Sequence, residues 1–219
     1  PVVAGTGGNS THEAIELTVS AAEAGADYSL SVTPYYNKPT QQGLFEHFQA
    51  VARSVNLPII LYNVPGRTGC DLSNDTVVKL SQIDNIVAIK DATGDVARGA
   101  ALIEAVPDGF AVFSGDDATA LELMRRGGQG NVSVTANIAA RDMAAMCNLA
   151  LTGEWEAAAD IDARLSELND LLFIEANPIP VKWAMAQRGM IEDGIRLPLT
   201  PLSEPCRGDL ERALETYFA

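Results

Sequence analysis

Apolar runs typical of β-strands alternate with helix-like segments along the first two thirds of the chain. This order constrains the fold more than any other feature. The runs are rich in Val, Ile, Leu and aromatic residues and lie at 1–7, 27–36, 58–66, 85–94, 110–117 and 130–137. The segment after each run has apolar residues at the three-and-four spacing of an amphipathic helix. Alternating strands and helices predict a parallel sheet with right-handed crossovers.

The pattern changes after Gly153. The segments 154–173, 178–190 and 203–218 have helical periodicity, and no strand-like run separates them. We therefore predict two domains: an α/β domain over residues 1–153 and a C-terminal helical domain over residues 154–219.

The number of strand-helix units bears on the type of sheet. Six units are too few for an eight-stranded barrel and suit an open doubly wound sheet. However, residue 1 is Pro and lies inside a strand-like run, as if the chain were cut from a longer one. Two further units at the front would make eight. The expected fold is therefore a (β/α)8 TIM barrel that lacks its first two βα units in this chain, so that six of eight are present.

Composition excludes several classes of function. The chain has 219 residues and a net charge of -14, and its few basic residues are scattered, which disfavours nucleic-acid and anionic-membrane binding. Cys70, Cys147 and Cys206 lie far apart, and neither His12 nor His47 has a partner at metal-ligand spacing. We expect reduced thiols and no metal. The absence of a signal-like start or a long apolar stretch predicts a cytoplasmic protein.

One charged side chain follows the apolar run 86–89, namely Lys90. An ammonium there loses hydration, so it must be paired, lose its proton or react, and a neutral lysine is a nucleophile for carbonyls. Strand alternation gives Lys90 and Tyr62 matching faces on neighbouring strands. The phenol would then shuttle protons while the lysine forms a Schiff base with a keto group. An ion pair with a neighbour such as Asp91 explains Lys90 equally well.

Other strand ends carry further candidates, each with an ordinary alternative. Arg67 follows a proline–glycine turn and offers a two-pronged donor for a carboxylate, although an exposed loop arginine is the commoner case. Tyr35 and Tyr36 suit an interface, or packing alone. The backbone at Gly115 and Val132 would approach a small ligand, unless these are simply turn and core residues.

Five motifs, in their order and spacing, resemble the dihydrodipicolinate synthase family: YNVPGRTG, NIVAIKDATG, SGDDATAL, VSVTAN and NPIPVKWA. The resemblance runs from Pro1 to about Ala219. It implies a (β/α)8 barrel with a C-terminal helical domain. The implied reaction needs no cofactor and condenses pyruvate with L-aspartate 4-semialdehyde through a lysine Schiff base. Its product is 4-hydroxy-tetrahydrodipicolinate, in lysine (diaminopimelate) biosynthesis.

The resemblance also assigns roles to single residues. It implies that Lys90 captures pyruvate, that Tyr62 relays protons beside it, and that Tyr36 reaches across a dimer interface into the neighbouring site. Arg67 would bind the carboxylate of the semialdehyde. The backbone at Gly115 and Val132 would border the pyruvate pocket.

Regulation and assembly follow from the same resemblance. Asn9, Glu13 and Tyr35 match part of the family's lysine effector site, although Glu13 also fits a capping box with Ser10. The implied assembly is a homotetramer of two tight dimers. Two alternatives stay open: a related aldolase such as N-acetylneuraminate lyase, which generally lacks an arginine at the place of Arg67, and a non-catalytic homologue, because the family's Thr-Thr pair is not in this chain.

Overall fold

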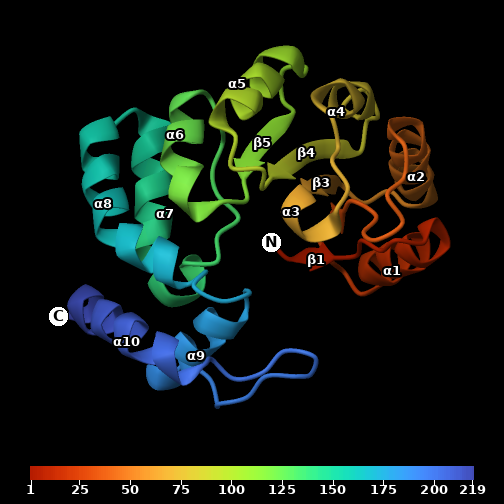
Figure 1. The fold of residues 1–219 in the computed structure, drawn as a ribbon. Coiled ribbons are helices and arrows are strands. Elements are labelled where there is room, and N and C mark those ends of the chain that lie inside the picture. Colours follow the sequence, from red (N-terminus) through yellow and green to blue (C-terminus); the bar gives the residue numbers. More distant parts are fainter. The chain divides into compact units, whose positions relative to one another are not determined.

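The computed structural model describes residues 1–219 and divides into two compact units (Figure 1). The first comprises Pro1–Asp116 and Arg125–Val132, and the second comprises Asp117–Met124 and Ser133–Ala219. The predicted domain boundary after residue 153 falls inside the second unit.

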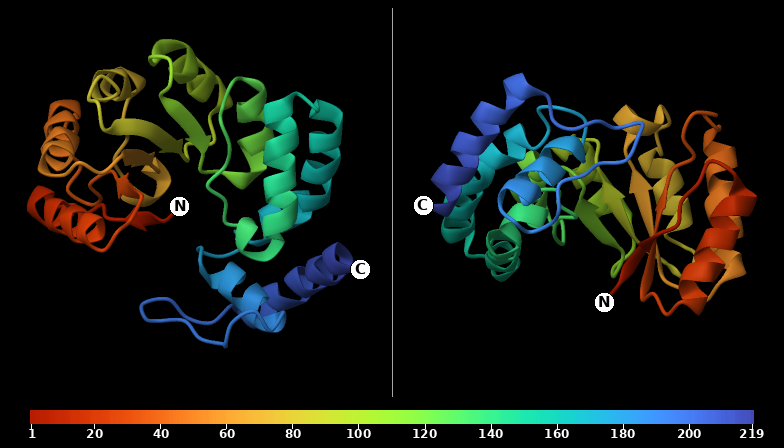
Figure 2. Two further views of the ribbon diagram at one scale, coloured as in Figure 1. Left: turned by 180° about the vertical axis from the view of Figure 1, so that it is seen from behind. Right: turned by 90° about the horizontal axis from the view of Figure 1, so that it is seen from below.

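The first unit is built on a five-stranded parallel sheet of order β1-β2-β3-β4-β5. Helices α1, α2, α4 and α5 follow one another along the outer face of this curved sheet, as Figures 1 and 2 both show. The predicted parallel α/β architecture is therefore confirmed. Its elements are β1 (Val3–Gly5), α1 (Thr11–Glu23), β2 (Tyr28–Val32), α2 (Gln41–Ser54), β3 (Ile59–Asn63), α3 (Pro65–Thr68), α4 (Asn74–Leu80), β4 (Ile86–Asp91), α5 (Val96–Ala105) and β5 (Ala111–Ser114).

Alternation along β3 and β4 separates a helix-covered face from the opposite face. Leu61 pairs with Ile89 in the ladder, and both are fully buried. They lie on the face that packs against helices, where Phe48 of α2 is also fully buried. The next residues along, Tyr62 and Lys90, pair with each other and point to the other face. The buried face holds the sheet in place, and the other face is available for chemistry.

Side-chain caps explain where the outer helices begin. Ser10 Oγ accepts the N–H of Glu13, as predicted, and Ser73 Oγ accepts the N–H of Thr76. Such caps satisfy backbone donors that the first helical turn leaves unpaired. They fix the points at which the chain leaves each strand-end loop.

The predicted sixth strand at 130–137 is wrong. Only Asn131 bridges to Ser114, and α7 already begins at Ala136. The backbone N–H groups of Val134 and Thr135 both donate to Asp117 Oδ2, at 2.9 Å each. From Val134 onward, a carboxylate rather than a neighbouring strand therefore accepts the backbone N–H groups of this segment. The chain contributes five strands and a single bridge where six strand-helix units were expected.

The second unit is helical. It contains η1 (Asp117–Thr119), most of α6 (Ala120–Arg125), α7 (Ala136–Thr152), α8 (Trp155–Leu171), α9 (Ile179–Gln187) and α10 (Glu204–Phe218). One apolar cluster joins α6, α7 and α8 through Met146 and Leu165, among others, and a second joins α8, α9 and α10 through Leu168 and Leu210. These clusters agree with the predicted helical C-terminal part.

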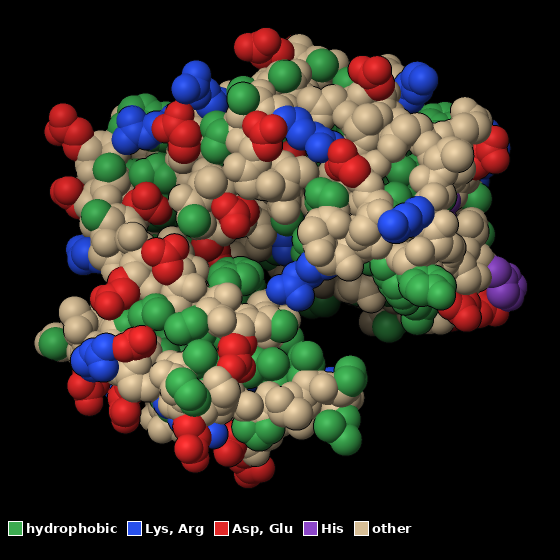
Figure 3. All heavy atoms as spheres, viewed as in Figure 1, with side chains coloured by type: hydrophobic (Ala, Val, Ile, Leu, Met, Phe, Trp, Pro, Cys, Tyr) green, Lys and Arg blue, Asp and Glu red, His purple; other side chains and the backbone are tan.

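Charges on the surface are mixed. Figure 3 shows acidic and basic side chains interspersed on the visible faces, with no broad basic patch there. None of the helices is both long and apolar enough to cross a membrane.

Candidate active site

Lys90 and Tyr62 lie side by side at the ends of β4 and β3. They are partners in the strand register, and Lys90 Nζ lies 4.3 Å from the centroid of the tyrosine ring. Burial raises the pKa of the Tyr62 phenol, and the positive charge of Arg67 offsets part of this rise. The structure thus brings together the amine and the phenol that strand alternation predicted would meet. It also places a guanidinium within electrostatic reach of the phenol.

Gly115 packs against the lysine from the end of β5. A Cβ atom built on Gly115 would lie 2.7 Å from Cε of Lys90 and 2.8 Å from Cβ of Ala92. The Gly115 N–H donates to the Asp91 carbonyl at 2.7 Å. Only glycine allows the backbone to approach the lysine stem this closely. Gly115 therefore helps to determine where the lysine chain runs.

Asp91 bears on the ion-pair explanation of Lys90. It follows Lys90 in β4, so alternation directs its carboxylate to the other face. There Oδ1 accepts the N–H of Thr93 at 2.9 Å. The side chain is buried, and this burial raises the pKa of the carboxyl. The geometry does not favour Asp91 as the counter-ion of Lys90.

Arg67 lies on the short helix α3, directly after β3. Pro65 opens this helix, and Gly69 ends it at a φ of 67° in the left-handed region. Within the turn, Thr68 Oγ1 donates to the Cys70 carbonyl at 2.8 Å. The proline–glycine turn before Arg67 is therefore part of a single helical turn with a left-handed glycine C-cap.

Val132 lies beside the end of β5. Its N–H donates to the Ser114 carbonyl at 2.8 Å, and the Ser114 N–H donates to Gly130. The segment that carries Val132 is thereby held against the strand end that leads into Gly115. The two predicted pocket-bordering positions are neighbours in the first unit.

Tyr36 has an unusual backbone. Its φ is 74°, a region that non-glycine residues rarely occupy, and the residue is 87% exposed. The Tyr36 N–H donates to the Thr68 carbonyl at 3.1 Å, which links its loop to α3. Tyr35 is also exposed. Tyr36 is thus linked through its backbone to the short helix that carries Arg67.

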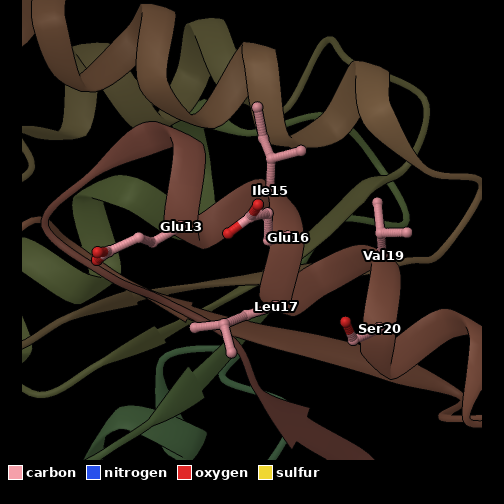
Figure 4. A pocket seen from close by; sticks show the side chains of 6 residues that line it. All are labelled: Glu13, Ile15, Glu16, Leu17, Val19 and Ser20. Atoms are coloured by element: carbon pink, nitrogen blue, oxygen red, sulfur yellow. The ribbon is translucent and has the colours of Figure 1, made fainter.

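The predicted effector residues Asn9, Glu13 and Tyr35 lie in the first unit. The Asn9 carbonyl accepts a hydrogen bond from Asn37 Nδ2 at 2.8 Å. Glu13 lines a hollow whose other lining residues, shown in Figure 4, all come from α1: Ile15, Glu16, Leu17, Val19 and Ser20. Neither Asn9 nor Tyr35 belongs to this hollow.

Sequence reasoning missed a group of polar residues next to the site: Gln41, Asn63, Asp71 and Arg98. Arg98 and Asp71 form a two-pronged ion pair, with both N···O distances 2.9 Å. The sequence carries one weak signal, since Asn63 stands directly after Tyr62 and Asp71 follows soon after the turn that carries Arg67. No group of three or more His, Cys, Asp or Glu side chains comes together as a metal site would require.

A lysine amine beside a phenol at the strand ends of a parallel sheet, with an arginine on the next loop, is the arrangement of an enzyme that acts on carbonyl substrates. Comparison with known sequences narrows this class. The chain belongs to the dihydrodipicolinate synthetase family, whose profile matches residues 1–217.

Individual relatives agree with this assignment. The chain is 59% identical over 214 residues to the 4-hydroxy-tetrahydrodipicolinate synthase of Nitrosomonas europaea, covering 98% of this chain and 73% of that protein. A solved dihydrodipicolinate synthase from Acinetobacter baumannii, complexed with pyruvate, superposes with a TM-score of 0.98 at 58% identity, covering 100% of this chain and 75% of that one. The synthase from Cyanidioschyzon merolae with lysine bound superposes with a TM-score of 0.96 at 41% identity, covering 99% and 74%.

Proposed function

We propose that this chain condenses pyruvate with L-aspartate 4-semialdehyde through a lysine Schiff base. The product is 4-hydroxy-tetrahydrodipicolinate, in lysine (diaminopimelate) biosynthesis. The observation that carries the proposal is Lys90 Nζ lying 4.3 Å from the Tyr62 ring, in a chain 59% identical to a relative named for this activity.

Lys90 is the proposed nucleophile. Its neutral amine attacks C2 of pyruvate, water leaves, and the resulting iminium draws electrons from C3. Loss of a C3 proton gives an enamine, whose carbon attacks the aldehyde of the second substrate. The amino group of that substrate then attacks the imine carbon, which closes the ring and releases Lys90.

Tyr62 is the proposed proton carrier for these steps. The removal of water from the first adduct needs a proton donor, and the aldehyde oxygen needs another proton when the carbon–carbon bond forms. Because burial raises the pKa of Tyr62, its phenol stays protonated at neutral pH and is available as a donor. We assign Tyr36 to the same relay in a neighbouring protomer.

Arg67 is the proposed ligand for the carboxylate of the semialdehyde. A planar guanidinium on a capped turn presents two parallel N–H donors, which match a carboxylate. The backbone at Gly115 and Val132 is proposed to border bound pyruvate. The presence of Arg67 also favours L-aspartate 4-semialdehyde over the substrate of N-acetylneuraminate lyases.

Borohydride trapping tests the nucleophile. The protein is incubated with pyruvate and sodium borohydride and digested, and the peptides are analysed by mass spectrometry. We expect a stable adduct on Lys90 and none in Lys90→Arg. Folded protein with Lys90 unmodified would refute the mechanism. A coupled assay that compares aspartate semialdehyde with N-acetylneuraminate then decides between the synthase and lyase activities.

Arg67→Ala separates the two half-reactions. We expect the truncated side chain to weaken the aldehyde step while imine trapping stays close to that of the wild type. Equal loss of both would contradict a role confined to the second substrate.

Assembly and regulation are also proposals. We propose a homotetramer, a dimer of dimers, because the exposed Tyr36 suits an interface between protomers. L-lysine is the proposed inhibitor at Asn9, Glu13 and Tyr35, supported by the lysine-bound relative. If light scattering showed a monomer and the assay showed full activity, the role of Tyr36 would be contradicted.

The proposal also includes the barrel fold. We propose that the five-stranded parallel sheet is part of a (β/α)8 barrel, which the close superposition on family structures supports. The cytoplasmic location stays a prediction.

A further inference from the structure

Four polar side chains bond the loop that follows Arg67 to β3, α2 and α5. We call Gln41, Asn63, Asp71 and Arg98 the loop clamp. Gln41 opens α2 just after the Tyr36 loop, Asn63 ends β3, and Asp71 lies between α3 and α4. Arg98 lies in the first turn of α5, which follows the strand of Lys90. None of the four belongs to the reaction described above.

The ion pair of Arg98 with Asp71 is the centre of the clamp. Nη1 and Nη2 of Arg98 donate to the two carboxylate oxygens of Asp71, and Nη2 also donates to the Leu72 carbonyl at 2.6 Å. The Arg98 side chain is 23% exposed and that of Asp71 is 48% exposed. Burial alone would raise the pKa of Asp71, but hydrogen bonds from Arg98 and Asn63 outweigh it and lower this pKa. The guanidinium therefore holds both the side chain and the backbone of this loop.

Asn63 and Gln41 extend the clamp to the neighbouring elements. Asn63 Nδ2 donates to Asp71 at 2.8 Å, and its Oδ1 accepts the Leu72 N–H at 3.1 Å. Gln41 Nε2 donates to the Asp71 carbonyl at 2.7 Å, and its Oε1 accepts from Ser73 at 2.9 Å. A single loop is thus bonded to β3, to α2 and to α5.

This geometry bears directly on Arg67. Arg67 lies on a segment whose two ends, Asn63 and Asp71, are joined to each other by a side-chain hydrogen bond. Arg98 attaches the same segment to the helix after β4, the strand that carries Lys90. The position of Arg67 relative to Lys90 therefore depends on contacts that neither side chain makes itself.

We propose that the loop clamp positions Arg67 relative to Lys90 and so sets how the second substrate meets the enamine. This inference rests on the proposed function for its catalytic consequence. Its members are positioning residues, because they act through Arg67 and touch no reacting atom.

Arg98→Lys is the main test variant. Lysine keeps the charge but loses the fork that bonds two carboxylate oxygens and a carbonyl at once. We expect kcat/KM for the semialdehyde to fall about tenfold or more, because small displacements of an orienting group are costly. Borohydride trapping of pyruvate should stay close to the wild-type rate. Asp71→Asn, which removes the charge and keeps the shape, should act in the same direction.

A matched control and a double variant sharpen the test. Arg212→Lys alters an exposed ion pair with Asp209 on α10 and should change neither reading. Arg98→Lys combined with Asp71→Asn should cost clearly less than the product of the single effects, because both remove the same contact. A structural defect without a positioning role would instead lower trapping and condensation in parallel, which would overturn the proposal.

Hydrogen exchange gives a reading that does not depend on activity. In Arg98→Lys, residues 64–73 should lose amide protection while α10 keeps it. Unchanged amide protection in Arg98→Lys would overturn the inference. So would a kcat/KM of Arg98→Lys equal to that of the wild type, provided that the wild type is active. If the wild-type chain neither traps pyruvate nor condenses it, the proposed function fails, and the exchange measurement alone still decides whether the clamp holds the loop.

Discussion

Gly115 shows how one missing side chain shapes the site. An added Cβ would lie 2.7 Å from Cε of Lys90, closer than non-bonded carbons approach. Gly115→Ala should therefore push the lysine chain away from Tyr62 and slow pyruvate trapping by about tenfold or more. Trapping kinetics measure this effect, and circular dichroism checks that the variant folds. Trapping at the wild-type rate would show that the lysine can move without loss.

Tyr62 allows the ring to be separated from the hydroxyl. Tyr62→Phe keeps an aromatic face 4.3 Å from Lys90 Nζ but removes the proposed proton carrier. We expect kcat to fall about 10²-fold, as for loss of a general acid–base group. Unfolding by urea should change little in comparison. A kcat near that of the wild type would assign the proton transfers to another group.

At this scale, the sequence predicted part of the site well. Strand alternation places Lys90 and Tyr62 on one face, and the ladder register makes them partners. The pairing of Arg98 with Asp71 could not be predicted, because it joins residues 27 apart, one at the start of a helix and the other in a loop. Loop geometry, unlike strand geometry, has no fixed period from which contacts can be counted.

At the scale of elements, the segment 130–137 shows where pattern reading fails. Its alternating Val residues fit a strand, yet two of its N–H groups donate to the buried Asp117 carboxylate. Periodicity reports which side chains are apolar. It does not report what satisfies the backbone.

Asp117→Ala tests this explanation. The substitution leaves the N–H groups of Val134 and Thr135 without their shared acceptor at the start of α7. Burying unpaired donors is costly, so we expect a loss of about 2 kcal/mol in unfolding free energy. Urea unfolding measures it. Asp117→Asn keeps one acceptor oxygen and should lose less; equal losses would mean that the hydrogen bonds are not the cause.

For the whole molecule, alternating strands and helices were sufficient to predict the parallel sheet and the helical C-terminal part. Both follow from periodicity that is repeated over many residues, so single errors do not change the result. The division into units was not predictable in the same way. Residues Asp117–Met124 belong to the helical unit, although in the sequence they separate the two segments of the first unit.

Stability should depend on pH through His47, which packs between α1 and α2. It is 5% exposed, Nδ1 shares a hydrogen bond with Thr11 Oγ1, and buried Nε2 has no partner. Burial lowers the pKa of His47, so below about pH 6.5 the unfolded chain binds a proton that the folded chain resists. The contribution of His47 to stability is therefore complete above its unfolded pKa and is lost as pH falls toward its folded pKa.

Urea unfolding at pH 7.5 and pH 5.5 should show this loss in the wild type and a smaller one in His47→Gln. His12→Gln is the matched control, because the His12 side chain is 82% exposed, and it should follow the wild type. The same pH dependence in His47→Gln as in the wild type would assign the loss to other groups.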